Sequence, residues 1–306
     1  MQAGLAQRLE SAVGVKVRAA IPLGGQHGVT HYRLELGDGR TAFAKAGAAS
    51  DAAGFAAEAA SLHWLAEAGA VAVPEVLGWD DTVLVLAWVP EGGAVPAAAA
   101  RFGRELAALH LAGADSFGAP WPGVIAGLPL PNDPPSGGGP AAEAQSGTAA
   151  QPGAAGAGWA QWYAAARVLP YLRIARDAGS LSARQASVIE AAAGHAPAVA
   201  GPAEPPARIH GDLWSGNLLW SGGRCWLVDP AAHGGHRETD LAMLDLFGAP
   251  YLAEIIAGYT ECAPLADGWR GRVPLHQLHP LLVHVCLFGG GYAAAAVRAA
   301  AAVLAL

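Results

Sequence analysis

The segment His210-Gly-Asp-Leu-Trp-Ser-Gly-Asn217, with Asp229 twelve residues beyond it, constrains this chain more than any other feature. Asp212 and Asn217 lie five residues apart and are expected on one loop, and the apolar run Trp226 to Val228 indicates a buried strand that leads to Asp229. A phosphoryl group in transfer needs a carboxylate near the acceptor hydroxyl and hard oxygen ligands for Mg²⁺. The spacing therefore predicts phosphoryl transfer from Mg-ATP, with Asp212 as the catalytic base and Asn217 and Asp229 as metal ligands.

Each of these residues also has an ordinary structural explanation. Asp and Asn are common in turns, so Asp212 and Asn217 alone could form an Asx turn, and Asp229 could start a turn before Pro230. The joint spacing, with Asp229 placed after a strand, makes metal binding the stronger interpretation. Asp240 begins an apolar helical stretch, and we expect it to cap that helix or to brace the catalytic loop rather than to bind metal.

Lysine is rare in this chain, because Lys16 and Lys45 are the two lysines among its 18 basic residues. Lys45 ends an apolar strand, and Glu58 lies thirteen residues later on a predicted helix. Kinases pair a strand lysine with a helix glutamate to hold the phosphates of ATP. We therefore expect Lys45 and Glu58 to bind the nucleotide, with Glu67 as the other candidate partner. A solvated lysine and a surface glutamate are the alternative.

Gly24, Gly25 and Gly28 precede a predicted strand, where glycines let backbone N–H groups approach phosphates. The segment has no GK[ST] ending of the Walker A type. We assign the three glycines to nucleotide binding, although an ordinary turn explains them nearly as well. Trp214 lies inside the catalytic loop, where it either stacks on a sugar face or packs in the core.

Several histidines near the C-terminus belong to the residue types that bind zinc. On one helix positions 276 and 279 share a face, but positions 284 and 286 do not line up with them. We therefore expect ordinary core and surface side chains, without zinc, at His276, His279, His284 and Cys286.

The hydrophobic pattern predicts an α+β chain with two lobes. The spacing of Asp212, Asn217 and Asp229 is the one that kinases of the protein-kinase-like fold use, so we expect that fold. Residues 1–90 are expected to form a small antiparallel β-sheet lobe with one helix at Phe55–Ala68. Its strands are predicted at Val29–Leu36, Thr41–Lys45, Val71–Pro74 and Thr82–Val89. Residues 91–306 are expected to form a larger, mostly helical lobe. The Pro- and Gly-rich stretch at 129–158 has the composition of a flexible insertion.

Composition limits the partners that such a chain would bind. The 306 residues carry a net charge of −7 without a basic block, which disfavours nucleic acid and anionic membranes as partners. The cysteines at 225, 262 and 286 show no CxxC spacing and favour a reducing cytoplasm. The first fifteen residues indicate an amphipathic helix without a signal-peptide core, and the apolar tail at 292–306 is short for a membrane span.

The chain resembles the fructosamine kinase (ketosamine-3-kinase) family. HGDxxxxN alone would also suit aminoglycoside phosphotransferases and choline kinases, whereas the HGDLWSGN form with the FGGGY segment is more specific. The matching segments follow in order over nearly the whole chain: Tyr32–Gly39, Phe43–Lys45, Ile125–Asn132, Gly211–Asn217, Asp229–Ala231, Gly235–Met243, Leu246–Gly248 and Leu287–Tyr292.

The resemblance implies phosphorylation of the 3-hydroxyl of ketosamines by ATP with Mg²⁺, which leads to deglycation of small molecules or proteins. By position it repeats the roles given above for the base, the metal ligands and the Lys45–Glu58 pair. It adds an adenine-binding hinge from Ala87 to Val89, and it places Trp214 beside the sugar.

Three positions depart from the family pattern. The glycine segment lacks the polar Asn or Asp expected there, and it has no cysteine, so redox switching is not expected. Ala87 stands where an acidic hinge residue is common. Two other hypotheses stay open: a kinase of the same fold that acts on an aminoglycoside or an amino alcohol, and a nucleotide-binding protein without catalysis. The sequence leaves the oligomeric state undetermined.

Overall fold

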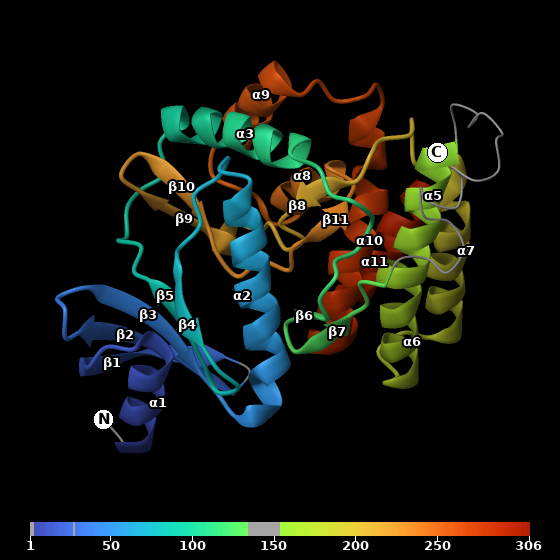
Figure 1. Ribbon diagram of the computed structural model, residues 1–306. Helices are drawn as coiled ribbons and strands as arrows, with labels where there is room; N and C mark the ends of the chain where they lie inside the picture. The colour runs from blue at the N-terminus through green and yellow to red at the C-terminus, as the bar shows by residue number, and fades with distance from the viewer. Residues whose placement is uncertain (1–2, 27, 134–153) are drawn as a thin grey trace, which may run out of the picture.

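The computed structural model describes residues 3–26, 28–133 and 154–306, and it has the two lobes that the sequence predicts (Figure 1). The smaller lobe, blue to cyan in the figure, holds a twisted sheet. The larger lobe, green to red, is mostly helical. The chain passes from one lobe to the other between β5 (Val83–Ala87) and α3 (Pro96–Leu111).

The sheet of the small lobe has five antiparallel strands in the order β1-β2-β3-β5-β4. The strands other than β5 are β1 (Val17–Gln26), β2 (Val29–Leu36), β3 (Thr41–Ala46) and β4 (Val76–Trp79). Successive side chains of a strand point to opposite faces. Val83 and Val85 accordingly pack with α1 (Ala3–Val13), and Leu84 and Leu86 pack with α2 (Ala52–Glu67).

The sheet is therefore covered by a helix on each face, the helix expected at Phe55–Ala68 and the amphipathic helix indicated for the first fifteen residues. The second is α1, whose Leu5 and Leu9 enter the core against β1 to β3 and β5. Between β3 and α2 the chain forms one 3₁₀ turn, Ala49–Asp51.

Two strand expectations were wrong. The segment at 71–74 is not a strand of the sheet: Ala72 forms one isolated bridge with Trp226, and the strand follows at β4. The glycine segment does not precede the first strand, because β1 comes before it. Gly24 and Gly25 belong to β1, and Gly28 lies in the turn to β2.

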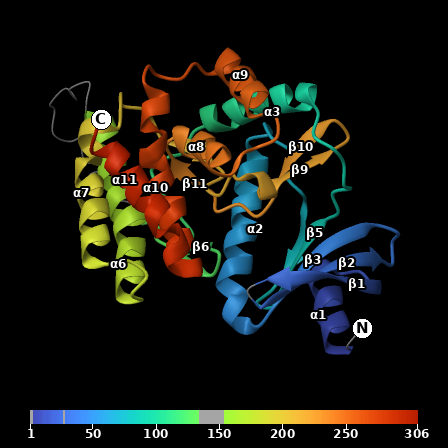
Figure 2. The ribbon, with the colours of Figure 1, turned by 180° about the vertical axis from the view of Figure 1, so that it is seen from behind.

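The larger lobe surrounds a core of large aromatic and aliphatic side chains from its helices, among them Trp159, Tyr163, Tyr171 and Leu278. Figure 2 shows α10, α11, α6 and α7 standing together on one side of this lobe. The helices after α3 are α5 (Ala154–Tyr163), α6 (Leu169–Asp177), α7 (Ala183–Val199), α8 (Glu238–Phe247), α9 (Leu252–Cys262), α10 (Trp269–Phe288) and α11 (Ala293–Val303).

Short strands carry the segments that face the small lobe. They form three two-stranded sheets: β6 (Gly123–Ile125) with β7 (Leu128–Leu130), β8 (Ala207–Ile209) with β11 (His233–Gly235), and β9 (Leu218–Ser221) with β10 (Arg224–Leu227). A π-helical turn, Ala164–Val168, joins α5 to α6, and 3₁₀ turns occur at Ser215–Asn217 and Gly289–Tyr292.

Most of the stretch expected to be a flexible insertion, 129–158, lies outside the described residues. Its ends are regular, because 129–130 belong to β7 and 154–158 begin α5. Within Trp269–Val303 an 18-residue window reaches a mean hydropathy of 1.6, so by length and composition alone this stretch could span a membrane. Here it is α10 and α11, which contribute Leu275, Leu278 and Val303 to the core of the large lobe.

Candidate active site

A cleft of about 910 Å³ runs between the two lobes and collects most of the predicted catalytic residues. Lys45 of β3 and Glu58 of α2 line it from the small lobe, while Asp212, Asn217 and Asp229 line it from the large lobe. Side chains from the β6–β7 hairpin and from the end of α10 complete the lining.

The loop that carries Asp212 is held from behind by Asp240. The Asp240 carboxylate is fully buried and accepts hydrogen bonds from the backbone N–H of His210 at 2.8 Å and of Gly211 at 3.0 Å. It also accepts one from His110 Nε2 at 3.1 Å, and Tyr259 donates its hydroxyl to His110 Nδ1 at 2.9 Å. Asp240 therefore braces the catalytic loop, one of its two expected roles. The capping role was wrong, because Arg237 occupies the N-cap of α8.

The His210 ring connects the catalytic loop to the strand that leads to Asp229. Because a carbonyl can only accept, Nε2 donates to the Val228 carbonyl at 3.0 Å, and Nδ1 accepts from the Asp212 N–H at 3.3 Å. Burial lowers the pKa of His210, which keeps this ring neutral and its tautomer fixed. Gly211 is required beside it, since its φ is 81° and a Cβ would lie 2.2 Å from the Ala231 oxygen.

Asp212 and Asn217 face one another across the loop. Asn217 Nδ2 donates to the Asp212 backbone oxygen at 2.8 Å and to Asp212 Oδ2 at 3.1 Å. Burial raises the pKa of Asp212 to about 7 against the opposing effect of the Asn217 hydrogen bond, and the negative charge of Asp229 adds to the rise. A carboxyl with a pKa near neutrality is suited to accept a proton from a hydroxyl.

Lys45 lies between two carboxylates. Its Nζ is 2.6 Å from Glu58 Oε2 and 2.7 Å from Asp229 Oδ1, and the lysine is 8% exposed. Burial alone would lower the pKa of Lys45, but Glu58 and Asp229 outweigh it and raise the pKa. Burial likewise tends to raise the pKa of Asp229, and the Lys45 charge reverses this. The predicted pairing of Lys45 with Glu58 is thus present, and Glu67 instead lies 3.9 Å from Arg208.

The site has the chemistry to hold a divalent cation. One lysine is shared by two carboxylates, Glu58 with its side chain 12% exposed and Asp229 with its side chain 37% exposed. Burial with the nearby Asp229 charge raises the pKa of Glu58 to about 7 in spite of Lys45. The elevated pKa of Asp212 has the same origin, a surplus of negative charge at low solvent exposure. Asn217 offers a carbonyl oxygen and Asp229 a carboxylate, which are ligand types that Mg²⁺ prefers. Asp229 takes a left-handed conformation, φ 53°, at the point where β10 ends.

The remaining nucleotide-binding candidates have structural surroundings of their own. A Cβ at Gly25 would lie 2.3 Å from the Val29 oxygen, so the β1–β2 hairpin itself requires glycine there, and Gly24 and Gly28 have φ of 112° and 84°. Ala87 ends β5, and Val89 lies two residues beyond. These five residues lie outside the lining of the cleft described above, and their contact with a nucleotide stays a prediction.

Trp214 is at the surface of the cleft rather than in the core, with 39% of it exposed. Its ring packs edge-on to Phe247 at 6.1 Å. Phe247 in turn contacts His284 at 4.9 Å, and His284 contacts Tyr292 at 4.8 Å. Sequence reasoning missed this row of rings because α8, α10 and the turn after α10 meet only in the folded chain.

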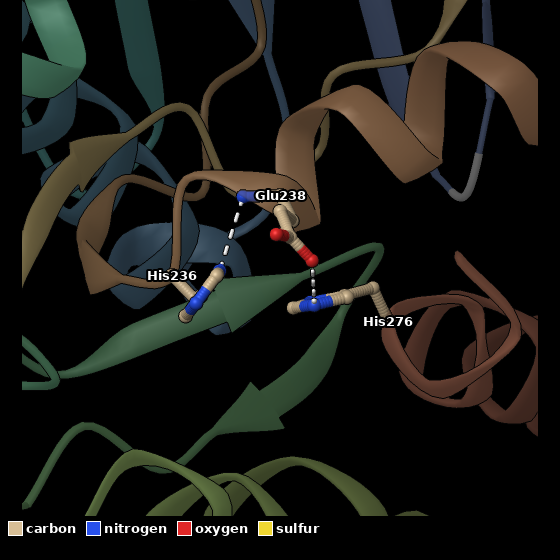
Figure 3. A group of neighbouring side chains, drawn as sticks. All are labelled: His236, Glu238 and His276. Atoms are coloured by element: carbon tan, nitrogen blue, oxygen red, sulfur yellow. Dashed lines mark hydrogen bonds and ion pairs between the residues drawn. The ribbon is translucent and has the colours of Figure 1, made fainter. Parts of the chain in front are cut away.

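A second group of titratable side chains lies behind the catalytic loop. Figure 3 shows His236, Glu238 and His276, whose ligand-type atoms lie within 4.8 Å of one another. Both Glu238 oxygens, however, accept from Arg272, at 2.6 and 2.9 Å, and His276 Nδ1 lies 3.0 Å from the Thr239 hydroxyl. A guanidinium already neutralises the carboxylate, so the group joins α8 to α10 as an ion-pair network.

His279 and His284, the other histidines considered for zinc, lie apart from this group. His279 is buried with its ring edge-on to Tyr171 at 4.9 Å, and His284 Nδ1 donates to the Pro280 carbonyl at 2.8 Å. Cys286 is a free, half-buried cysteine.

Comparison with known proteins decides the family. The fructosamine kinase family model matches residues 1–136 and 139–305. The chain belongs to the fructosamine kinase family. A probable ketoamine kinase of Synechocystis sp. is 32% identical over 245 residues, which cover 78% of this chain and 74% of the relative. A probable ketoamine kinase of Klebsiella aerogenes is 28% identical over 96% of this chain and 95% of its own length.

Solved structures agree with the membership in this kinase family. A crystal structure from Thermobifida fusca, named as a candidate fructosamine-3-kinase, superposes with a TM-score of 0.86 at 46% identity over 99% of both chains. A type I macrolide 2′-phosphotransferase superposes with a TM-score of 0.61 at 16% identity over 97% of both chains. The second likeness concerns the fold alone and confirms the predicted two-lobed, protein-kinase-like architecture.

Proposed function

We propose that this fructosamine kinase family member transfers the γ-phosphoryl group of ATP to the 3-hydroxyl of a ketosamine, with Mg²⁺ as the metal. The observation that carries the proposal is the position of Asp212. It is a half-buried carboxyl with a pKa of about 7, and it lies in the same cleft as Asn217, Asp229 and Lys45. The family membership narrows the acceptor to ketosamines.

The residues divide the work of the reaction. Asp212 orients the acceptor hydroxyl and takes its proton, while His210 and Asp240 keep the loop in place. Lys45, held by Glu58, binds phosphate oxygens. Asn217 and Asp229 would hold Mg²⁺, which supplies charge neutralisation on the phosphates when bound. Because the groups are fixed before the reaction, little reorganisation is needed at the transition state.

The exposed face of Trp214 would lie against the sugar of the acceptor, as the family resemblance implies. Phosphorylation at the 3-hydroxyl makes the ketosamine unstable, so the proposed consequence is deglycation of small molecules or proteins. We place this activity in the cytoplasm, where the free cysteines Cys225, Cys262 and Cys286 stay reduced. Nucleic acid and membranes are not among the proposed partners.

The test is release of ADP from ATP with fructosyl-lysine, ribulosyl-lysine and the uncharged fructose adduct of butylamine as acceptors, in the presence and absence of Mg²⁺. Asp212→Asn should lower kcat by roughly 10²–10⁴-fold, the usual contribution of a general base, while nucleotide binding is nearly unchanged. Ser215→Ala in the same loop is the control for local disturbance. Full activity of Asp212→Asn would refute the role of the base, and no ketosamine-dependent release by the wild type would refute the acceptor class.

A further inference from the structure

The β6–β7 hairpin forms one side of the cleft. Gly123 pairs with Leu130 and Ile125 with Leu128, which leaves Ala126 and Gly127 as a two-residue tip. Their φ angles are 48° and 80°, the left-handed pair of a type I′ turn, which matches the twist of two short strands. Alanine is unusual in this conformation, so the tip is a specific feature of this hairpin.

Buried side chains of the large lobe fix the base of the hairpin. Arg167, in the π-helical turn, donates from Nη2 to Asn132 Oδ1 at 2.8 Å and from Nη1 to the Pro131 carbonyl. Tyr171 donates its hydroxyl to the Pro129 carbonyl at 2.8 Å. The guanidinium also stacks over Trp162, with Cζ 4.5 Å from the ring centroid.

Arg167 is 1% exposed, and within the described residues no carboxylate pairs with it. Burial lowers its pKa to about 9, so it is still protonated at neutral pH. A buried charge without an ion pair is costly unless polar atoms satisfy it. Here the oxygens at the end of the hairpin satisfy Nη1 and Nη2, while Nε has no partner in the described part of the chain, and this ties the position of the hairpin to that of Arg167.

The hairpin segment is also attached to the small lobe. Trp121, just before β6, packs edge-on to Trp64 of α2 with ring centroids 5.6 Å apart. The guanidinium of Arg208, in β8, lies over the Trp64 ring, with Cζ 4.4 Å from the ring centroid. It also donates a hydrogen bond to the Trp64 carbonyl at 2.5 Å. Figure 1 shows the hairpin between α2 and the end of α10. It is thus a fixed wall rather than a free loop.

The surface that this wall presents is uncharged. Val124, Ile125, Ala126, Gly127 and Pro129 line the cleft. The end of α10 contributes Leu287 and Phe288 to the same lining, and the following 3₁₀ turn contributes Tyr292. The charged side chains among the described lining residues belong to the catalytic loop with its brace, to the Lys45 cluster, and to Asp51 just before α2. An acceptor bound at Asp212 extends away from the nucleotide phosphates, and this uncharged part of the cleft is where its remainder fits.

We propose that the β6–β7 hairpin is the specificity wall for the amine-bearing substituent of the acceptor, and that it selects ketosamines whose substituent is uncharged and apolar. This inference rests on the proposed function. The physical reason is that an apolar wall rewards burial of hydrocarbon, whereas a charged group placed there loses its hydration without gaining a partner.

The test compares three fructose-derived ketosamines that differ at one end of the substituent: those of butylamine, trimethylenediamine and γ-aminobutyrate. They place a methyl, an ammonium or a carboxylate group at the same distance from the sugar. Wild-type kcat/KM should be highest for the butylamine derivative. A higher kcat/KM for the carboxylate derivative would overturn the proposal.

A matched pair of variants isolates the wall itself. Ala126→Asp and Ala126→Asn have the same shape, and both residue types tolerate the left-handed conformation of the tip. Relative to Asn, the Asp variant should raise kcat/KM for the ammonium derivative and lower it for the carboxylate derivative by roughly two- to fivefold each, the size of a screened charge interaction. The methyl derivative and the KM for ATP should not differ between the two variants.

Equal kcat/KM ratios for the Asp and Asn variants over the three acceptors would overturn the assignment of the wall, even with an active enzyme. Failure of the proposed function looks different, because then the wild type would turn over none of the three ketosamines. As a control, both variants should unfold thermally at the same temperature as the wild type, which would show that the substitutions at the hairpin tip leave the fold unchanged.

Discussion

Replacement of Asp240 by Asn tests whether the buried brace holds the catalytic loop. The Asp240 carboxylate accepts from three donors, the N–H groups of His210 and Gly211 and the His110 ring. Hydrogen bonds to a charged group contribute about 1.5–3 kcal/mol each, against about 0.5–1.5 for neutral ones. In the Asn variant one of the two oxygens becomes an NH₂ group, which faces a donor and leaves it unsatisfied.

In the Asn variant two of the hydrogen bonds become neutral ones and the third is lost, which together costs about 4 kcal/mol. Part of this cost is offset because the variant no longer buries a charge. We therefore expect the free energy of unfolding to fall by about 2–4 kcal/mol. A domain with a total stability of about 5–15 kcal/mol stays folded under this change, so kcat can be measured on the same protein. The kcat should fall by at least about tenfold, because the loop that carries Asp212 loses hydrogen bonds that hold it in place.

Urea denaturation and steady-state kinetics provide the two readings. Asp245→Asn is the matched control, since it makes the same substitution on the same helix at an exposed site. There the carboxylate accepts one long hydrogen bond, 3.4 Å from Gln277 Nε2 to Asp245 Oδ2. It should change the free energy of unfolding by less than about 0.5 kcal/mol. If Asp240→Asn were as mild as this control in both stability and kcat, the idea that Asp240 braces the loop would be wrong.

Two further predictions concern the other charged clusters. Lys45→Met leaves the half-buried acids Glu58 and Asp229 side by side without their cation, so it should destabilise the protein by about 1–3 kcal/mol and weaken ATP binding at least about tenfold. Denaturation and calorimetric titration measure the two effects, and unchanged ATP affinity would contradict the role of Lys45. Burial would raise the pKa of Glu238, but the bonds from His276 and Arg272 outweigh it and lower the pKa from 4.5 to about 2. The resulting stabilisation, about 3 kcal/mol, is complete above the unfolded pKa and is lost as the pH falls toward the folded one. The free energy of unfolding of Glu238→Gln should accordingly fall less than that of the wild type between about pH 6 and about pH 3. An equal dependence of this free energy on pH in the two proteins would contradict the prediction.

The sequence predicted the parts of the site that depend on short-range order. Asp212 and Asn217 share a loop, and Asp229 follows a strand, because five- and twelve-residue spacings leave the chain few alternatives once the flanking apolar strands are buried. The pairing of Lys45 with Glu58 could also be predicted, since β3 and α2 are neighbours in the chain and the glutamate has the helical position that faces the strand end.

Other parts depend on contacts between distant segments, which no local pattern records. The apolar run Val71–Pro74 has the composition of a strand, but Pro74 and its place between α2 and the catalytic region leave it a single bridge to Trp226. The β6–β7 hairpin depends on a buried arginine that lies 35 residues from Asn132. A signal was nevertheless present, since Ala-Gly between alternating apolar residues at 123–130 is compatible with a tight hairpin.

Asp212 and Asp240 show how one residue type serves two roles in the same site. Asp240 is buried and Asp212 is half-buried, and the loss of solvent alone would raise the pKa of each. Asp240 meets three donors, so hydrogen bonds, first from His110 and then from the His210 backbone, hold its pKa below the ordinary value and keep it an ionised brace. Asp212 meets one amide donor and the repulsion of Asp229, so its pKa rises to about 7. The number of donors that the fold supplies, rather than burial, therefore separates the structural acid from the one poised to accept a proton.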